Sequence, residues 1–261
     1  MALDLDAIRK RLSGLQNQTG RQNNLWKPEP GKQIIRIVPY QHNKENPFNE
    51  LLFHYNLGKK NYLSPMTHGR PDPVAEFAQK LKASGNSDEW KLGKKLEPIM
   101  RTYVPVIVRG LESEGVKLWG FGKTVYQELL GFIADPDYGD ITDPVNGRDI
   151  VVEFTPAEGG GYPKTSIRVK PNTSHVSDDK NILDKIVGDQ PELTKIFKEP
   201  SYDDLKAALE AWLNPEDDQQ VAGYNENNKP AESKSTTSEP VTAGVSNVDD
   251  VAGAFDELFN Q

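Results

Sequence analysis

The chain has 261 residues, of which 36% are hydrophobic and none is cysteine. That length allows one large domain or two small ones, and the low apolar share predicts a folded core joined to a disordered segment. The missing cysteines exclude a disulfide framework and a Cys-based zinc site, which favours an intracellular protein. No apolar run is long enough for a signal peptide or a membrane span.

The formal net charge of −8 is unevenly distributed along the chain. Residues 1–198 contain 28 Lys/Arg and 25 Asp/Glu, for a net charge of +3, and residues 1–123 alone reach +8. Residues 199–261 contain 3 Lys/Arg and 14 Asp/Glu, for a net charge of −11. This asymmetry predicts an anionic ligand for the front of the chain and an acidic tail at its end.

The hydrophobic periodicity predicts mainly short strands with a few helices. In chain order we expect an amphipathic helix at 4–15, strands at 33–40, 50–57 and 61–65, a helix at 72–84, a hairpin of strands at 102–110 and 116–123, a helix at 124–135, a second hairpin at 149–156 and 165–171, and a helix at 201–213 capped by Ser201. One helix between two strand pairs favours a mainly β, α+β fold with an OB-type five-stranded barrel core.

Three of these strands carry one apolar face and one face with cations, two of them with aromatic rings as well. The second faces hold Tyr103, Arg109, Lys117, Trp119, Phe121, Lys123, Arg168 and Lys170. If the strands share a sheet, these faces predict a groove for single-stranded nucleic acid, in which cations neutralise phosphates and rings stack on bases. The alternative is that Trp119 and Phe121 face the core while Lys117 and Lys123 reach solvent.

Two loops repeat the combination of cations and aromatic residues. Tyr162 and Lys164 belong to the glycine-rich loop "AEGGGYPK", and Lys59, Lys60 and Tyr62 lie between two expected strands. Both sets are candidates for nucleic-acid binding, although an ordinary turn tyrosine and a solvated loop explain them too.

No catalytic or metal motif is complete in this sequence. "FGKT" at 121–124 lacks the first glycine of a phosphate-binding loop, and 135–146 has the glycine and closing glutamate of a calcium loop misplaced. The four histidines have no zinc-binding spacing. We therefore expect a binding protein without cofactors.

The chain resembles the single-stranded-DNA-binding, helix-destabilising proteins of T-even-like bacteriophages. The resemblance rests on "LWKPEPGKQIIRIVPY" (25–40), "THG" (67–69), "RTYVPVIV" (101–108), "WGFGKTVYQELLGFI" (119–133) and "DDVAGAFDELFNQ" (249–261), in this order. It implies an OB-fold core that binds single strands, a basic N-terminal arm for cooperative self-association, and an acidic tail that recruits replication and recombination proteins. It also implies action in DNA replication, recombination and repair, in the cytoplasm of the infected host.

Position by position, the resemblance places Tyr103 and Trp119 where that family has aromatic residues in its DNA cleft, and Tyr162 near another such place. Arg101 is a further candidate for nucleic-acid binding. Lys59 and Lys60 fall on a basic pair before a metal subdomain. His54 matches the histidine of that family's zinc site, but the three cysteines have no counterpart here. We therefore expect no zinc, and an insert around 54–95 that is held by packing or shortened.

The resemblance divides the chain into an arm, a core and a tail. The arm (1–20) carries Arg9, Lys10 and Arg11 for self-association, although only "RKRLS" (9–13) approximates the family's basic cluster. The core (21–198) is followed by a helix (199–214), a disordered linker (215–248) and an acidic tip (249–261).

The tip combines acids with large apolar residues. Val251, Ala254, Phe255, Leu258 and Phe259 can share one helical face, beside Asp249, Asp250, Asp256 and Glu257. Such a helix fits a groove on a partner protein. A merely solubilising tail is the alternative, but it needs no paired phenylalanines.

Two other functional classes remain open from the sequence. One is a metal-dependent nuclease acting on single strands in the same groove. The other is a virion or scaffold protein whose tail contacts a shell. The favoured hypothesis is a non-enzymatic protein that coats and protects single-stranded DNA.

Overall fold

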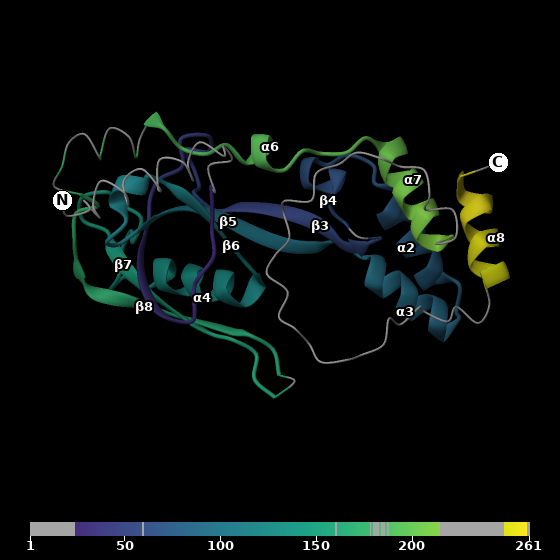
Figure 1. Cartoon of the computed structure of the whole chain (residues 1–261), viewed down its shortest axis with the longest axis horizontal. Coiled ribbons are helices and arrows are strands. Elements are labelled where there is room, and N and C mark those ends of the chain that lie inside the picture. Colours follow the sequence, from purple (N-terminus) through teal and green to yellow (C-terminus); the bar gives the residue numbers. More distant parts are fainter. Residues whose placement is uncertain are drawn as a thin grey trace, which may run out of the picture.

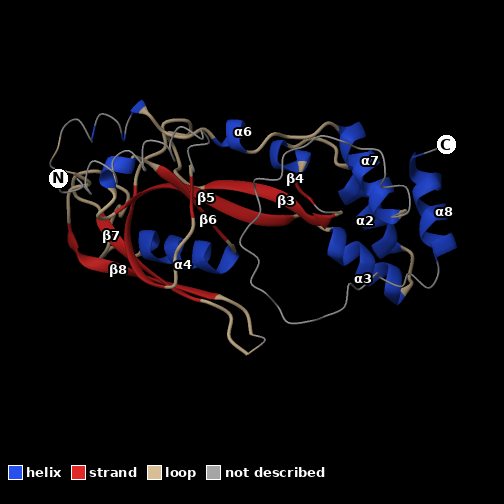
Figure 2. Cartoon of the chain, in the orientation of Figure 1, coloured by secondary structure: helices blue, strands red, loops and turns tan. Residues whose placement is uncertain are grey.

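The computed structural model describes residues 24–58, 60–159, 161–177, 179, 183, 186, 188–214 and 248–259. The molecule is elongated, with a curved sheet at one end and a group of helices at the other (Figure 1). Two long strands of the sheet, β3 (Asn49–Leu57) and β5 (Ile99–Val108), run toward the helices and connect the two parts (Figures 1 and 2).

The sheet has eight strands. Its main path is β1 (Leu25–Trp26), β6 (Lys117–Phe121), β5, β2 (Gly31–Ile37), β7 (Arg148–Thr155) and β8 (Lys164–Thr173), while β3 pairs with β5 and with β4 (Lys60–Leu63). The pairs β5–β6 and β7–β8 are antiparallel, as both expected hairpins require. Among the described residues the two end strands, β1 and β8, do not pair, so the barrel is not closed.

Helix α4 (Lys123–Ala134) packs against one face of the sheet, which we call the α4 face. Ile35, Val104, Val106, Trp119 and Ile150 lie on this face and are buried. Val125, Tyr126 and Leu129 of α4 complete the cluster. On the other side of the sheet, the outer face, residues between Val176 and Phe197 cover parts of β5 and also Val38, which follows β2, so that β5 is buried on both sides over most of its length.

The helical lobe consists of α2 (Pro73–Ala83), α3 (Ser87–Leu96), α7 (Tyr202–Leu213) and α8 (Val248–Phe259) around a second apolar cluster. Asp72 caps α2 by accepting hydrogen bonds from the backbone N–H of Val74 and Ala75. Ser201 and Asp204 form a capping box at the start of α7, as expected for Ser201. The short elements are the 3₁₀ helices η1 (Pro65–His68) and η2 (Glu112–Glu114) and the helix α6 (Leu193–Ile196).

The structure confirms the α+β class and every strand and helix expected between residues 33 and 213, within a few residues at each end. Helix α3, strand β1 and the short helices are additions that the sequence analysis did not predict. The expected helix at 4–15 and the linker, apart from Val248 at the start of α8, lie outside the described residues. None of the helices that the structure describes has the length and hydropathy needed to cross a bilayer.

Candidate nucleic-acid interface

The expected grouping of Tyr103 with Trp119 on one open face is wrong. The β5–β6 register pairs Trp119 with Val104 and Tyr103 with Gly120. Because directly opposed residues in a sheet share a face, Tyr103 and Trp119 lie on opposite faces. A prediction made from each strand alone cannot give this result. It fixes how side chains alternate within one strand, but not which face of that strand lies on the same side of the sheet as a given face of its neighbour.

Trp119 and Phe121 belong to the core under α4. Trp119 is only 1% exposed and meets the ring of Trp26 edge-on at 5.6 Å and that of Phe121 at 4.6 Å. Neither Trp119 nor Phe121 presents a face on which a base could stack. The alternative considered for this strand, with aromatic rings inward, is therefore correct for both residues.

Tyr103 is also buried, on the outer face, against the rings of Phe53 and Phe197. Burial raises the pKa of its hydroxyl to about 12. The ring lies so close to Gly120 that a Cβ at that position would stand 2.5 Å from Tyr103 Cε1. The ring therefore serves packing in this structure and is not open to a base.

The outer face of β7 and β8 does collect cations. The registers of β2, β7 and β8 place Lys32, Arg168 and Lys164 on this face together with Glu153. Lys164 and Arg168 are exposed, and Lys32 lies 3.7 Å from Glu153 in an exposed ion pair. Of the expected second faces, those of β5 and β8 lie on this side of the sheet, whereas that of β6 lies on the α4 face.

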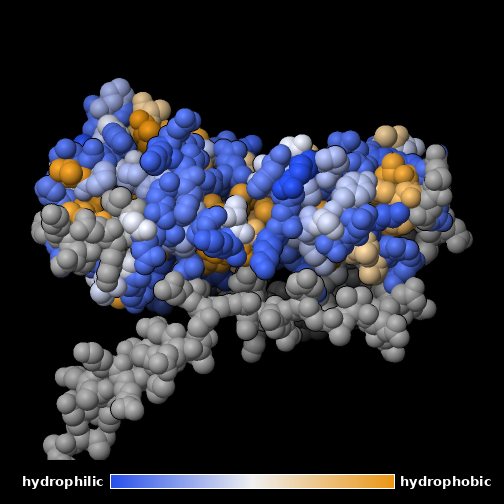
Figure 3. Space-filling view, turned by 90° about the horizontal axis from the view of Figure 1, so that it is seen from above, coloured by the Kyte–Doolittle hydropathy of each residue, from blue (hydrophilic) through white to orange (hydrophobic). Residues whose placement is uncertain are grey.

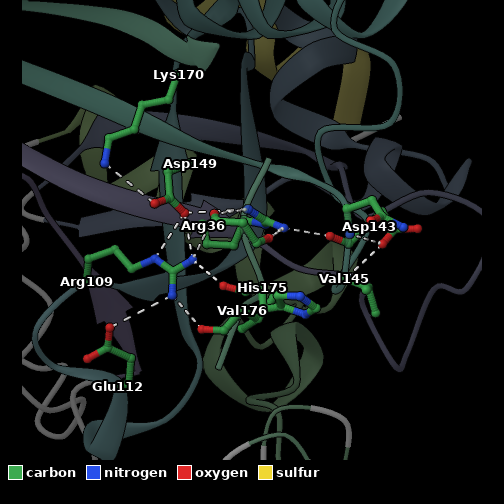
Figure 4. Close-up of polar contacts among 11 residues, drawn as sticks. Arg36, Arg109, Glu112, Asp143, Val145, Asp149, Lys170, His175 and Val176 are labelled. Atoms are coloured by element: carbon green, nitrogen blue, oxygen red, sulfur yellow. Dashed lines mark hydrogen bonds and ion pairs between the residues drawn. The ribbon is translucent and has the colours of Figure 1, made fainter. Parts of the chain in front are cut away.

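Arg109 and Lys170 are engaged within the protein by Asp149 (Figure 4). The Arg109 guanidinium donates to Asp149 Oδ1 at 2.7 and 3.0 Å and to the carbonyl of His175 at 2.8 Å. Lys170 Nζ lies 3.6 Å from Asp149 Oδ2. Arg109, expected to bind phosphate, therefore holds the strand ends together, and its charge is largely compensated.

Arg36 lies at the centre of the same network and is fully buried. Its guanidinium donates to the carbonyls of Asp143 at 2.7 Å and Ser174 at 2.8 Å, and lies 3.5 Å from Asp149 Oδ1. Burial lowers the pKa of Arg36, and Asp149 acts against that shift by favouring the charged form. The network, which the sequence analysis did not find, anchors the root of the β7–β8 hairpin (Figure 4).

The remaining predicted cations are dispersed. Arg101 is exposed and donates to the Gly120 carbonyl at 2.9 Å. Lys117 lies on the α4 side, half-buried and paired with Glu114, while Lys123 is exposed at the first turn of α4. Lys60 is exposed and Tyr62 is half-buried beside the helical lobe. Lys59 lies outside the described residues.

Tyr162 is the most exposed of the large apolar and aromatic side chains in the described part of the chain, at 94%. It sits in the loop between β7 and β8, two residues before Lys164. This hairpin projects from the sheet on the same side as α4 and α3 (Figure 1). An exposed ring at a projecting tip can stack on an unpaired base.

Trp90 in α3 is a further exposed ring, which the sequence analysis missed. It is 50% exposed, and Lys91, Lys94 and Lys95 follow it on the same helix. Ile99, at the start of β5, is likewise exposed. The sequence feature that could have indicated this helix is Asn86, which caps the start of α3 and precedes "WKLGKK" (90–95).

His54 occupies the position that the resemblance assigned to a zinc ligand. It is buried, with Nδ1 2.8 Å from the Leu96 carbonyl and Nε2 2.9 Å from Asp72 Oδ2. Ser64 also donates to Asp72. Burial acts to raise the pKa of Asp72, but the bonds from His54 and Ser64 outweigh it and hold the pKa below its usual range.

These residues do not fit a zinc ion. Both ring nitrogens of His54 are already engaged, and the chain has no thiol ligand. In the part of the chain that the structure describes, no three His, Cys, Asp or Glu side chains are grouped to hold a metal. The insert is instead held by the His54–Asp72 pair and the apolar cluster of the lobe.

The predicted partner-binding residues form the expected helix, α8, but it is docked on this chain. Phe255 is buried and Phe259 half-buried against the helical lobe, whereas Asp256, Glu257 and Leu258 are exposed. The structure does not describe the side chains of Asp249 and Asp250, nor the arm residues Arg9, Lys10 and Arg11.

Exposed cations on a strand face, and exposed rings on the β7–β8 hairpin and on α3, are the groups that bind single-stranded nucleic acid without reading its sequence. Residues 29–213 match the family model described as gp32 DNA binding protein like. This match covers most of the chain, and the protein belongs to that family. Membership supports a single-stranded-DNA-binding role. No curated protein sequence matches the chain.

Proposed function

We propose that the protein coats and protects single-stranded DNA, cooperatively, during phage replication, recombination and repair in the cytoplasm of the infected host. The observation that carries the proposal is the combination of family membership with the exposed ring of Tyr162 at the tip of the hairpin whose strand β8 carries the exposed cations Lys164 and Arg168. The strands β2, β5, β6, β7 and β8 would be its OB-type core.

Two elements, the β7–β8 hairpin and α3, make contact with the DNA strand in this proposal. The β7–β8 hairpin offers Tyr162 and Lys164, and α3 offers Trp90 with the lysines after it. Both stand on the same side of β3 and β5 (Figure 1). Phosphates would run along the cations while bases stack on the two rings.

The test is to titrate a labelled oligonucleotide and follow its fluorescence anisotropy. Tyr162→Ala and Trp90→Ala should each weaken binding by about 1–3 kcal/mol per lost stack, without lowering the unfolding free energy. Leu111→Ala is a matched control, because Leu111 is also exposed but lies beside η2. Unchanged affinity in both folded variants contradicts the interface.

The protein acts without catalysis and without zinc in this proposal. Its family is one of binding proteins rather than enzymes. Labelled single strands incubated with the protein and magnesium should therefore stay intact, and dialysis against a chelator should leave the unfolding curve unchanged. Cleavage products would favour the nuclease alternative.

The acidic end of the chain would add two functions. Phe255 and Phe259 of α8 recruit replication proteins, and the charge of the tail competes with DNA for the basic surface. Removing residues 215–261 deletes 10 acids and 2 lysines, a net change of +8. The truncated protein should bind single strands more tightly at low salt, with the gain shrinking as salt screens the charges.

A further inference from the structure

Helix α8 fills a groove between α2 and α7. Val251 and Phe255 are 6% and 4% exposed, and they pack with Phe77 of α2 and Leu205 and Leu209 of α7. The ring of Phe255 meets that of Phe77 edge-on at 5.9 Å. Figure 1 shows α8 alongside α7 and α2 at the end of the molecule, and Figure 3 shows hydrophobic residues at this end as well as at the opposite end.

Two lysines at the rim of the groove hold the C-terminal half of α8. Lys80 Nζ lies 2.6 Å from Glu257 Oε2 and 3.0 Å from the Ala254 carbonyl. Lys206 Nζ lies 3.1 Å from the Phe259 carbonyl and 5.2 Å from the centre of the Phe259 ring. Lys206 thus reaches an open carbonyl of the last turn, and both cations, lying toward the C-terminus of α8, complement the helix dipole. The groove thus recognises an acidic helix with two phenylalanines four residues apart.

The rest of the lobe is joined without α8. Tyr202 of α7 donates to Glu76 of α2 at 2.7 Å, and α2 and α7 also meet through the apolar cluster. Among the described residues, no backbone hydrogen-bond ladder joins α8 to the lobe. The two are held together by contacts that involve side chains. Helix α8 is therefore an element that can leave and return while the groove persists.

The chain between α7 and α8 is far longer than this docking requires. Residues 214–247 connect Leu213 to Val248, a stretch of 34 residues. A chain of that length can span at most about 110–120 Å. Insertion of α8 into the groove of another copy makes the same contacts as insertion into its own, so the exchange costs only chain entropy.

We propose that the groove between α2 and α7 receives α8 from a second copy of this chain when copies lie side by side on one DNA strand. The proposal rests on the proposed function, since the strand brings the copies together. Neighbours on one strand hold their grooves and helices at millimolar effective concentration, which favours exchange over the free protein. The exchanged helices then link adjacent copies.

Crosslinking between two full-length variants tests this link. The chain has no cysteine, so Lys80→Cys and Glu257→Cys each introduce one reactive thiol. The two side chains almost touch at an open hollow next to Ala254, where a short bis-maleimide can reach both. The two variants are mixed with single-stranded homopolymers of increasing length, treated with the reagent, and separated by denaturing electrophoresis.

The expected result is a crosslinked pair of different variants on long strands, and several-fold less of it on free protein or on strands that hold one copy. Adding Phe255→Ala to the Glu257→Cys variant should reduce this product, because it removes the buried ring and keeps the charge. The proposal is overturned if no mixed product forms while the double variant Lys80→Cys plus Glu257→Cys crosslinks within one chain. It is also overturned if Phe255→Ala changes nothing.

DNA binding is measured in the same samples by the anisotropy of the labelled strand. If the variants bind long strands and no mixed product forms, the exchange fails and the proposed function stands. If they do not bind single strands at all, the proposed function itself fails, and the exchange fails with it.

Discussion

The sheet and the helical lobe are each fastened by a buried polar pair that includes an aspartate, but the two regions differ in what surrounds that pair. Arg36 and Asp149 lie among strands that are already joined by ladders of backbone hydrogen bonds. His54 and Asp72 connect β3 to the start of α2, where neighbouring helices meet through side chains. The lobe thus depends on side-chain packing in the region where the family resemblance implied a metal, and it is the region from which we propose that α8 detaches.

The largest effect is expected from removing the shared carboxylate of either pair. Asp149→Ala leaves Arg36 and Arg109 without their common partner, which should cost about 3–5 kcal/mol of unfolding free energy. Asp72→Ala should cost a similar amount, but hydrogen exchange should locate the loss in α2 and α3. Denaturant unfolding with hydrogen exchange on both variants measures this.

Equal loss of protection throughout the molecule in both variants would contradict the comparison. The sheet and the lobe would then unfold as one cooperative unit, and the difference in their construction would have no consequence for stability.

The second prediction concerns the core tryptophan of the sheet. Trp119→Ala should lower the unfolding free energy by about 3–5 kcal/mol, because it empties a fully packed site under α4. The affinity of the protein that remains folded should match wild type, in contrast to Tyr162→Ala. Anisotropy titration at a temperature where the variant is folded measures this. If the Trp119→Ala variant were as stable as wild type but bound single-stranded DNA more weakly, Trp119 would have to be assigned to the DNA interface after all.

The third prediction is an acid sensitivity located in the lobe. Because the pKa of Asp72 in the folded protein lies below its usual range, the unfolded chain takes up this proton more readily. The carboxylate therefore stabilises the fold above the pKa of an unfolded aspartate, about 4, and this stability is lost as the pH falls through the folded pKa. Asp72→Asn should show a shallower fall of unfolding free energy between pH 7 and pH 3 than wild type. Parallel curves for the two proteins would mean that Asp72 makes no contribution.

The smallest effect is expected on the salt dependence of binding. Arg168→Gln should reduce the slope of log affinity against log salt by about 0.7, the value for one lost phosphate contact on a single strand. Lys195→Gln is the control, because Lys195 is also exposed but lies on α6. If both variants show the wild-type slope, the outer face of β8 does not contact phosphate.

The sequence was sufficient to predict the local elements, because alternation, capping residues and turns are local properties. Ser201 and the hairpin at 149–171 illustrate this. It was insufficient for Tyr103 and Trp119, because the relative register of two strands depends on the turn and the core between them.

The same limit explains the misassigned cations. In the sequence Arg109 and Arg168 follow the same strand alternation, yet Arg109 is engaged by Asp149 just after the end of β5, and Arg168 is exposed on β8. What separates them is Asp149, which is 40 residues away from Arg109 in the chain. A charge pair of that kind is set by tertiary packing, and no periodicity within a strand reports it.

The contact between Gly120 and Tyr103 limits how the two positions can evolve. A Cβ at position 120 would stand 2.5 Å from the Tyr103 ring, so a single replacement there collides before any compensating change occurs. The passage to a larger residue at position 120 therefore runs through a smaller residue at position 103 first. We therefore expect related proteins to differ at positions 103 and 120 together, with the smaller residue at position 103 arising before the larger residue at position 120.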